Sequence, residues 1–149
     1  YWQDIGIKVN IRFVDSKDMT REVLKTRDYD VLLYGIIIGS DPDQYPFWHS
    51  DQVTYPGLNL SYYINRSADE LLETIRETDN EEELATLYTD LQNILLEDIP
   101  AAFLYTPIYT YALTDDIKGF DVDHISHPSD RFSNIAEWYI GTKKIWKLN

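Results

Sequence analysis

The first third of the chain has the hydrophobic patterns of two β-strands and an intervening helix. Residues 7–13 alternate apolar and polar side chains, and this period of two predicts a strand with one buried face. A helix is predicted to begin at Asp15 or Ser16. Residues 31–38 are apolar on both faces and rich in β-branched side chains, which predicts a central strand covered on both sides. Together these elements predict a βαβ unit with parallel strands.

The middle of the chain reads as a long loop followed by two amphipathic helices. Residues 39–63 have no sustained period and contain three prolines, so they predict a functional loop with one helical turn near 44–49. Ser67 with Glu70 predicts a capping box at the start of the first helix. Asn80 with Glu83 predicts the start of the longer helix, which ends at Pro100. Residues 101–105 and 108–113 are predicted to be extended.

Composition and charge narrow the classes of partner. The chain has 149 residues, of which 44% are hydrophobic, and its longest apolar run is too short to span a membrane. A formal charge of −13 disfavours binding to nucleic acid and to anionic membranes. The acidity either maintains solubility or attracts a cationic ligand into a cleft. The lack of cysteine excludes disulfides, thiolate nucleophiles and thiolate zinc sites.

Two carboxylates follow the apolar run, at Asp41 and Asp43. Ligands of open α/β sheets bind beyond the carboxyl ends of the strands, so these residues are candidates for an ammonium group or a metal. They also fit an ordinary turn, or the acid–base pair of a glycosidase. His124 and His127 lack a partner at metal-ligand spacing, so neither a metal site nor a cofactor is predicted. Motifs of a nucleophile with its base are absent from the sequence, which favours a binding protein over an enzyme.

Short motifs along the whole chain are similar to those of one transport-protein family. In order they are Gly6-Ile7-x-Val9, Tyr29-Asp30-Val31, Asp41-Pro42-Asp43, Tyr62-Tyr63, Glu97-Asp98-Ile99-Pro100 and Ile117-Lys118-Gly119-Phe120. On these residues the chain resembles the C-terminal half of the peptide/nickel-type (family 5) extracellular solute-binding proteins of ABC transporters. The order and spacing of the motifs make the resemblance specific.

The resemblance implies an α/β fold, the C-terminal lobe of a type II periplasmic-binding-protein-like architecture with a central, mostly parallel sheet flanked by helices. Residues 1–149 are then expected to form one domain, a fragment of a larger receptor that also has an N-terminal lobe. Such a receptor closes two lobes on its ligand and delivers it to an ABC permease in the membrane. The implied location is extracytoplasmic, in the periplasm or at the cell surface, with a lipid anchor at the N-terminus as one option.

The resemblance also implies which residues contact the ligand. In peptide-binding relatives, backbone groups of the strand that matches residues 34–38 bind the peptide, and a following aspartate pairs with its α-amino group. This chain departs from that pattern, because it has Gly35-Ile36 in place of Gly-Trp and Gly39 in place of the aspartate. Peptides or another small polar solute are therefore predicted, with a carbohydrate receptor or an enzyme using Asp41 and Asp43 as alternatives. The predicted ligand-binding residues are Gly35, Ile36, Ile37, Gly39, Asp41, Tyr45, Trp48 and Asn59.

Overall fold

A computed structural model describes residues 1–39, 41–123 and 125–141 of the chain. The chain divides into two compact units. Unit one comprises Tyr1–Tyr34 and Asp43–Ala102, and unit two comprises Gly35–Pro42 and Phe103–Asn149. In the part of the chain that is described, no helix is long and apolar enough to cross a membrane.

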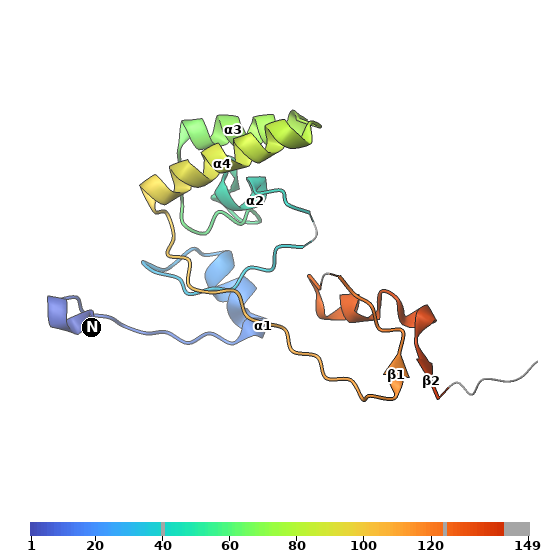
Figure 1. Ribbon diagram of the computed structural model, residues 1–149. Helices are drawn as coiled ribbons and strands as arrows, with labels where there is room; N and C mark the ends of the chain where they lie inside the picture. Colours follow the sequence, from blue (N-terminus) through green and yellow to red (C-terminus); the bar gives the residue numbers. More distant parts are fainter. Residues whose placement is uncertain (40, 124, 142–149) are drawn as a thin grey trace, which may run out of the picture. The chain divides into compact units, whose positions relative to one another are not determined.

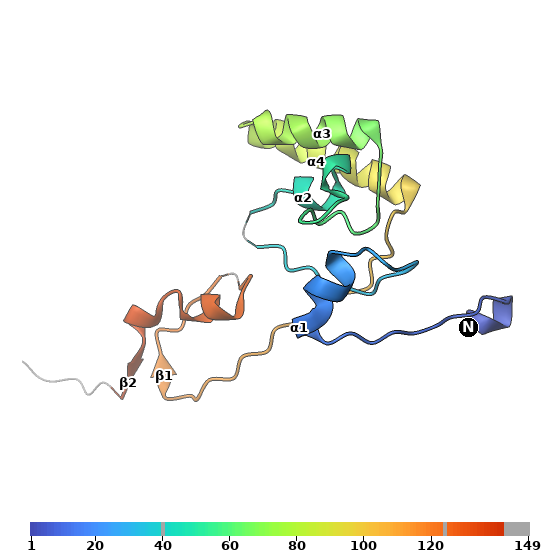
Figure 2. The same cartoon turned by 180° about the vertical axis from the view of Figure 1, so that it is seen from behind.

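Unit one is built on two long helices, α3 (Arg66–Glu77) and α4 (Glu81–Asp98), which lie side by side in both views of the ribbon (Figures 1 and 2). Their facing apolar stripes form the core together with Tyr63. The buried members of this core are Tyr63, Ala68, Leu72, Ile75 and Leu91, and the stripe of α4 packs against them. The two amphipathic helices predicted from the periodicity are therefore confirmed.

The caps of these helices match the sequence prediction at one position and differ at another. Helix α4 begins after Asn80, whose side-chain oxygen accepts from the backbone N–H groups of Glu82 and Glu83 at 3.0 and 3.1 Å, as predicted. Helix α3 begins after Asn65, so the capping box predicted at Ser67 is wrong. Asn65 is extended and its Oδ1 accepts from the N–H of Ser67 at 2.9 Å, which leaves Ser67 inside the first turn.

Shorter helices complete unit one. They are η1 (Gln3–Ile5), α1 (Ser16–Met19), the π-helical η2 (Thr20–Leu24), α2 (Tyr45–Trp48) and η3 (Ser50–Gln52). The helix expected after Asp15 and the helical turn expected near 44–49 are both present. Helix η2, which continues directly from α1, buries Val23 and Leu24.

Unit two contains a small sheet and a cluster of aromatic rings. Strands β1 (Ile117–Lys118) and β2 (Tyr139–Ile140) pair antiparallel, with Ile117 opposite Ile140. Two 3₁₀ helices, η4 (Pro128–Phe132) and η5 (Ile135–Glu137), precede β2. Gly119 has a φ of 80°, and an added Cβ there would overlap the carbonyl oxygen of Glu137. A glycine is therefore required where the chain leaves β1.

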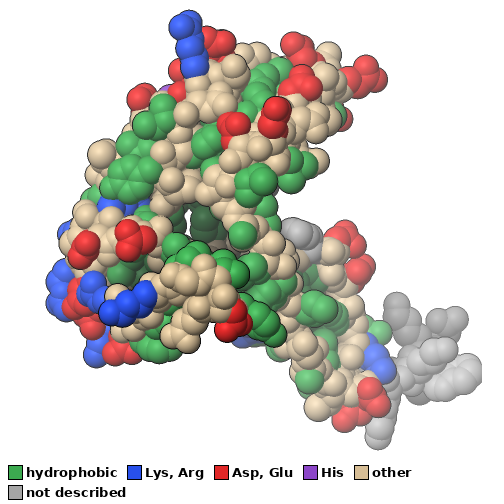
Figure 3. Space-filling view, turned by 90° about the vertical axis from the view of Figure 1, so that its left-hand side faces the viewer, with side chains coloured by type: hydrophobic (Ala, Val, Ile, Leu, Met, Phe, Trp, Pro, Cys, Tyr) green, Lys and Arg blue, Asp and Glu red, His purple; other side chains and the backbone are tan. Residues whose placement is uncertain are grey.

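The central, mostly parallel sheet is not observed in the residues that the structure describes, which contain one two-stranded antiparallel sheet. Residues 7–13, 31–38 and 101–113 are not in strands, and Figure 1 draws them as extended traces. Several apolar side chains of these segments are exposed, including Phe13, Leu33 and Ile108, and hydrophobic side chains lie on the surface in Figure 3. Apolar alternation predicts an extended segment with a face to cover, but a ladder also needs a hydrogen-bonding partner. In the described residues these three segments form no such ladder.

Candidate ligand-binding site

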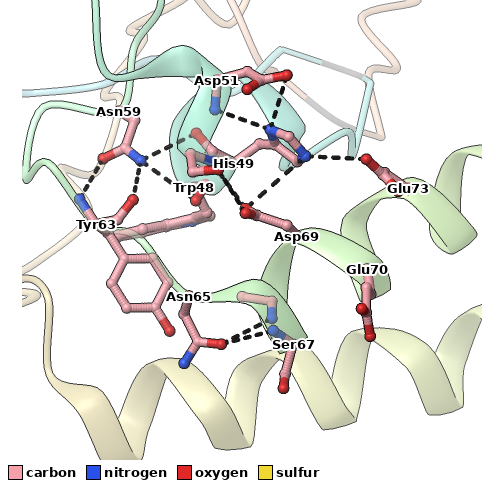
Figure 4. A network of polar contacts seen from close by, with 12 residues as sticks. Trp48, His49, Asp51, Asn59, Tyr63, Asn65, Ser67, Asp69, Glu70 and Glu73 are labelled. Atoms are coloured by element: carbon pink, nitrogen blue, oxygen red, sulfur yellow. Dashed lines mark hydrogen bonds and ion pairs between the residues drawn. The ribbon is translucent and has the colours of Figure 1, made fainter.

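The long loop of unit one is organised around the side chain of Asn59, which is 0% exposed. Its Nδ2 donates to the carbonyl oxygens of His49 and Tyr63 at 3.1 and 2.8 Å, and more distantly to that of Trp48 at 3.4 Å. Its Oδ1 accepts from the N–H of Tyr63 at 3.0 Å and from the Ser61 hydroxyl at 3.3 Å. The amide thus joins the end of α2 to the approach of α3 (Figure 4).

The aromatic residues Tyr45 and Trp48 lie on α2 beside this amide. The Tyr45 ring stacks on the imidazole of His49 with centroids 4.0 Å apart, and the Arg76 guanidinium lies 4.1 Å from the centre of the same ring. Trp48 meets Tyr63 edge to face at 6.3 Å. Three of the predicted site residues, Tyr45, Trp48 and Asn59, are therefore brought together in one half-buried cluster.

His49 is the buried centre of the polar contacts shown in Figure 4, with its side chain 5% exposed. Its Nδ1 accepts from the backbone N–H of Asp51 at 3.1 Å. Nε2 faces Glu73 Oε1 at 3.4 Å and Asp69 Oδ1 at 3.9 Å, and it makes no hydrogen bond within the described residues. This arrangement positions the loop against two carboxylates of α3.

Helix α3 supplies the partners that hold the loop. Asp69 accepts from the N–H and the hydroxyl of Ser50 at 2.8 and 2.6 Å, and Arg76 donates twice to Asp43 at 2.9 and 3.1 Å. Asp43 also accepts from the N–H of Tyr45, the first residue of α2, at 3.0 Å. Asp69, Glu73 and Arg76 are not among the residues predicted from the sequence. Their spacing of four and then three residues from Asp69 places them on one helix face, which is the signal that could have found them.

The base of the cluster contains two groups with shifted pKa values. Burial raises the pKa of the Tyr63 hydroxyl well above its usual range, and the hydrogen bond of 2.6 Å to Asp98 raises it further. The same hydrogen bond, with a second from Asn65 at 2.7 Å, lowers the pKa of the Asp98 carboxyl. The hydrogen bonds among Tyr63, Asn65 and Asp98 therefore connect the start of α3 to the end of α4.

The remaining predicted site residues belong to unit two. Ile36 and Ile37 are 46% and 69% exposed, and Asp41 is also exposed. A Cβ added at Gly35 would meet nothing within 4 Å, and one at Gly39 would lie 3.5 Å from the His127 ring. These residues are accessible within their own unit. As ligand contacts, they and the residues of the α2 cluster stay a prediction.

Clusters of possible metal ligands were sought among the residues that the structure describes. Across residues 1–39, 41–123 and 125–141, no group of three or more His, Cys, Asp or Glu side chains could hold a metal ion. His124, one half of the histidine pair considered from the sequence, lies outside the described residues.

Comparison with known proteins identifies peptide-binding proteins as relatives of this chain. The oligopeptide-binding protein AppA of Bacillus subtilis (strain 168) is 28% identical over 137 residues, which are 91% of this chain and 24% of AppA. The probable D,D-dipeptide-binding periplasmic protein DdpA of Escherichia coli (strain K12) is 29% identical over 120 residues, 78% of this chain and 23% of DdpA. The di/tripeptide-binding protein 2 of Pseudomonas aeruginosa (strain UCBPP-PA14) is 26% identical over 82% of this chain and 23% of the relative.

The fold agrees with the sequence similarity. The solved structure of AppA from Bacillus subtilis in complex with a nonapeptide superposes with a TM-score of 0.75 and 27% identity, covering 94% of this chain and 27% of AppA. No family model matches the sequence. The chain spans about a quarter of the length of the curated relatives that it matches. The relatives of this chain are thus binding proteins for oligopeptides, dipeptides and tripeptides, which confirms the resemblance to the family 5 solute-binding proteins.

Proposed function

We propose that this chain is part of the C-terminal lobe of an extracytoplasmic solute-binding protein that captures peptides and delivers them to an ABC permease. In this proposal residues 1–149 act together as one lobe, an N-terminal lobe supplies the other wall of the cleft, and closure buries the ligand. The observation that carries the proposal is the match of 94% of the chain to a protein solved with a bound nonapeptide.

The segment 31–38 supports peptide as the ligand. Within the described chain its backbone N–H and C=O groups make no hydrogen bonds, although the segment is extended and apolar. An extended peptide can satisfy such groups by adding itself as a neighbouring strand, which gives affinity through the main chain with little dependence on sequence. Gly35, Ile36, Ile37 and Gly39 provide this main-chain surface in the proposal.

Side chains then orient the peptide and pack its residues. Asp41 follows residues 31–38 and, two residues after Gly39, can substitute for the aspartate that the resemblance places at Gly39 and receive the α-amino group of the peptide. Tyr45 and Trp48 offer flat rings with polar edges, which suit the side chains of varied peptides. Asn59 holds the loop that carries these rings. An enzyme that uses Asp41 and Asp43 is not favoured, since the relatives are binding proteins and Asp43 is engaged by Arg76.

The test is calorimetric titration of the full-length protein with a mixture of random nonapeptides, followed by a mixture of oligosaccharides. Heat with peptides alone is expected. Asp41→Asn is then expected to weaken binding of peptides with a free amino terminus about 10- to 150-fold, since a charged hydrogen bond is worth about 1.5–3 kcal/mol. Binding of N-acetylated peptides should be unchanged.

The matched control is Asp79→Asn, because Asp79 is an exposed aspartate outside the proposed site. Trp48→Phe, which keeps an aromatic ring against Tyr63, tests the packing surface without emptying the core. Heat with oligosaccharides and none with peptides would overturn the peptide proposal in favour of a carbohydrate receptor. Unchanged affinity in both Asp41→Asn and Trp48→Phe would refute the residue assignment while leaving the receptor function intact.

A further inference from the structure

Three residues other than glycine have a positive φ in the part of the chain that is described: Arg27 at 55°, Tyr62 at 54° and Ile99 at 49°. In this left-handed conformation the Cβ of an L-residue crowds a carbonyl oxygen, so only glycine adopts it without a steric cost. For two of the three the fold supplies a reason. Arg27 is enclosed and donates to the carbonyl of Gly57, and Ile99 ends α4, where a left-handed residue is common.

The side chain of Tyr62 gains no contact that explains its backbone conformation. It is 49% exposed, and across residues 1–39, 41–123 and 125–141 its ring and hydroxyl have no hydrogen-bond, ion-pair or ring partner. By contrast, Tyr29, Tyr45 and Tyr63 are each engaged by another residue of the protein. Strained residues of this kind cluster at functional sites, which indicates that the exposed ring serves a partner outside the chain.

The turn that carries Tyr62 is fixed on both sides of it. Asn59 accepts from the N–H of Tyr63 at 3.0 Å and donates to the carbonyl oxygen of Tyr63 at 2.8 Å. It also accepts from the hydroxyl of Ser61 at 3.3 Å. The backbone before and after Tyr62 is therefore already ordered, so a ligand that contacts the ring pays little entropy for ordering the turn.

The same turn is tied to the chain that enters residues 31–38. The Tyr29 hydroxyl donates to the carbonyl oxygen of Leu60 at 2.7 Å, and Tyr29 precedes Val31 by two residues. Tyr29, residues 31–34 and the turn all belong to unit one, so this connection lies within one unit. The ring is therefore available to a side chain of a peptide that lies along residues 31–34.

We propose that the ring of Tyr62 binds a basic side chain of the peptide, which makes it a specificity-determining residue of the receptor. The face of a tyrosine ring attracts a cation, and a formal charge of −13 favours cations at long range. Unit one already pairs tyrosine rings with its own cations. Lys25 Nζ lies 5.3 Å from the ring centre of Tyr55, and the Arg76 guanidinium lies 4.1 Å from that of Tyr45. The inference rests on the proposed function as a peptide receptor.

Calorimetric titration of the full-length protein with two nonapeptide libraries tests this contact. Each library has one variable residue at a random position in a background of alanine and serine. That residue is lysine in the first library and norleucine in the second, so the two side chains have similar length and differ in charge. The net charge of the protein favours lysine in every variant, so the informative quantity is the change in lysine preference. Tyr62→Gly is expected to reduce this preference about two- to fivefold, the factor that an exposed cation–π contact supplies, and Tyr62→Phe should keep it.

Urea unfolding of the same variants separates a ligand contact from a structural role. Glycine adopts a φ near 54° without steric cost, so Tyr62→Gly is expected not to lower the urea midpoint. Ile99→Gly is the matched control, because it removes another exposed side chain from a left-handed residue, and it should keep the full lysine preference. An unchanged preference in Tyr62→Gly, or a reduced one together with a lowered urea midpoint, would overturn the Tyr62 contact but not the receptor. Failure of the wild type to bind either library would refute the peptide function, and the contact with it.

Discussion

Replacing Asn59 by alanine is the sharpest test of how the loop between α2 and α3 is held in place. The Asn59 side chain is fully buried, and it is the hydrogen-bond partner of both backbone groups of Tyr63. The carbonyl of His49 has a second donor, the N–H of Gln52 at 3.0 Å, so it does not depend on Asn59. The substitution therefore leaves the N–H and the C=O of Tyr63 without a partner while they remain shielded from water.

The magnitude follows from these two groups. A buried group left unsatisfied costs about 1–3 kcal/mol, so the pair costs about 2–6 kcal/mol. That is a large share of the stability of a typical domain, about 5–15 kcal/mol. Asn59→Asp is expected to cost more than the alanine variant, because it keeps the acceptor for Tyr63 but sets a carboxylate oxygen against carbonyl oxygens in a buried site.

The assay is urea unfolding of the wild type and each variant, with the free energy of unfolding extrapolated to water. Asn93→Ala is the matched control, because Asn93 is an exposed residue of α4 and alanine is a good helix former. The control should lie within about 0.5 kcal/mol of the wild type. An Asn59→Ala variant within about 1 kcal/mol of the wild type would refute the role of this amide as the organiser of the loop.

Three further predictions follow from local geometry. Hydrogen bonds from Tyr63 and Asn65 lower the pKa of the Asp98 carboxyl, so the stability that it contributes is present above its ordinary pKa of about 3.9 and is lost as the pH falls through the lowered value. Tyr63→Phe should raise the pKa of Asp98 in an NMR titration. An unchanged pKa would contradict this assignment. Gly57→Ala should lower the free energy of unfolding by about 1–3 kcal/mol, because the new Cβ overlaps the carbonyl of Gln52, whereas Gly35→Ala, where space is open, serves as the stability control. Ile99→Gly should stabilise the protein by about 1 kcal/mol in thermal unfolding, because Ile99 ends α4 with a φ of 49° and is 70% exposed; a loss of stability would show that its side chain is needed.

The helical part of the fold was predictable because its information is local. The apolar residues of 66–77 and 81–98 recur at helical spacing, and burying them against each other requires only the short connection between the two helices. The cap at Asn80 was predictable for the same reason. The error at Ser67 has a physical cause, since serine and asparagine are both good caps and the sequence does not say which of two nearby candidates adopts the extended conformation.

The strands were less predictable because a sheet is a relation between segments. The alternation of residues 7–13 predicts that one face is to be covered, yet it carries no information about the partner or the register. The candidate site was also predictable only in part. The missing period and the prolines of residues 39–63 indicated a functional loop, and the structure does gather Tyr45, Trp48 and Asn59. The contacts of His49 with α3 required the fold itself.

The burial of Asn59 decides how binding experiments on this protein should be interpreted. Its polar atoms are all engaged by the protein, so loss of peptide binding in Asn59→Ala would follow from collapse of the loop even if Asn59 never touches a ligand. Asp41 is exposed, so a substitution there changes an accessible group at lower cost to the core. A weakened affinity is therefore evidence for a ligand contact only where the free energy of unfolding stays near that of the wild type. By this criterion Asp41 is the residue that tests recognition, through the positively charged amino terminus of the peptide.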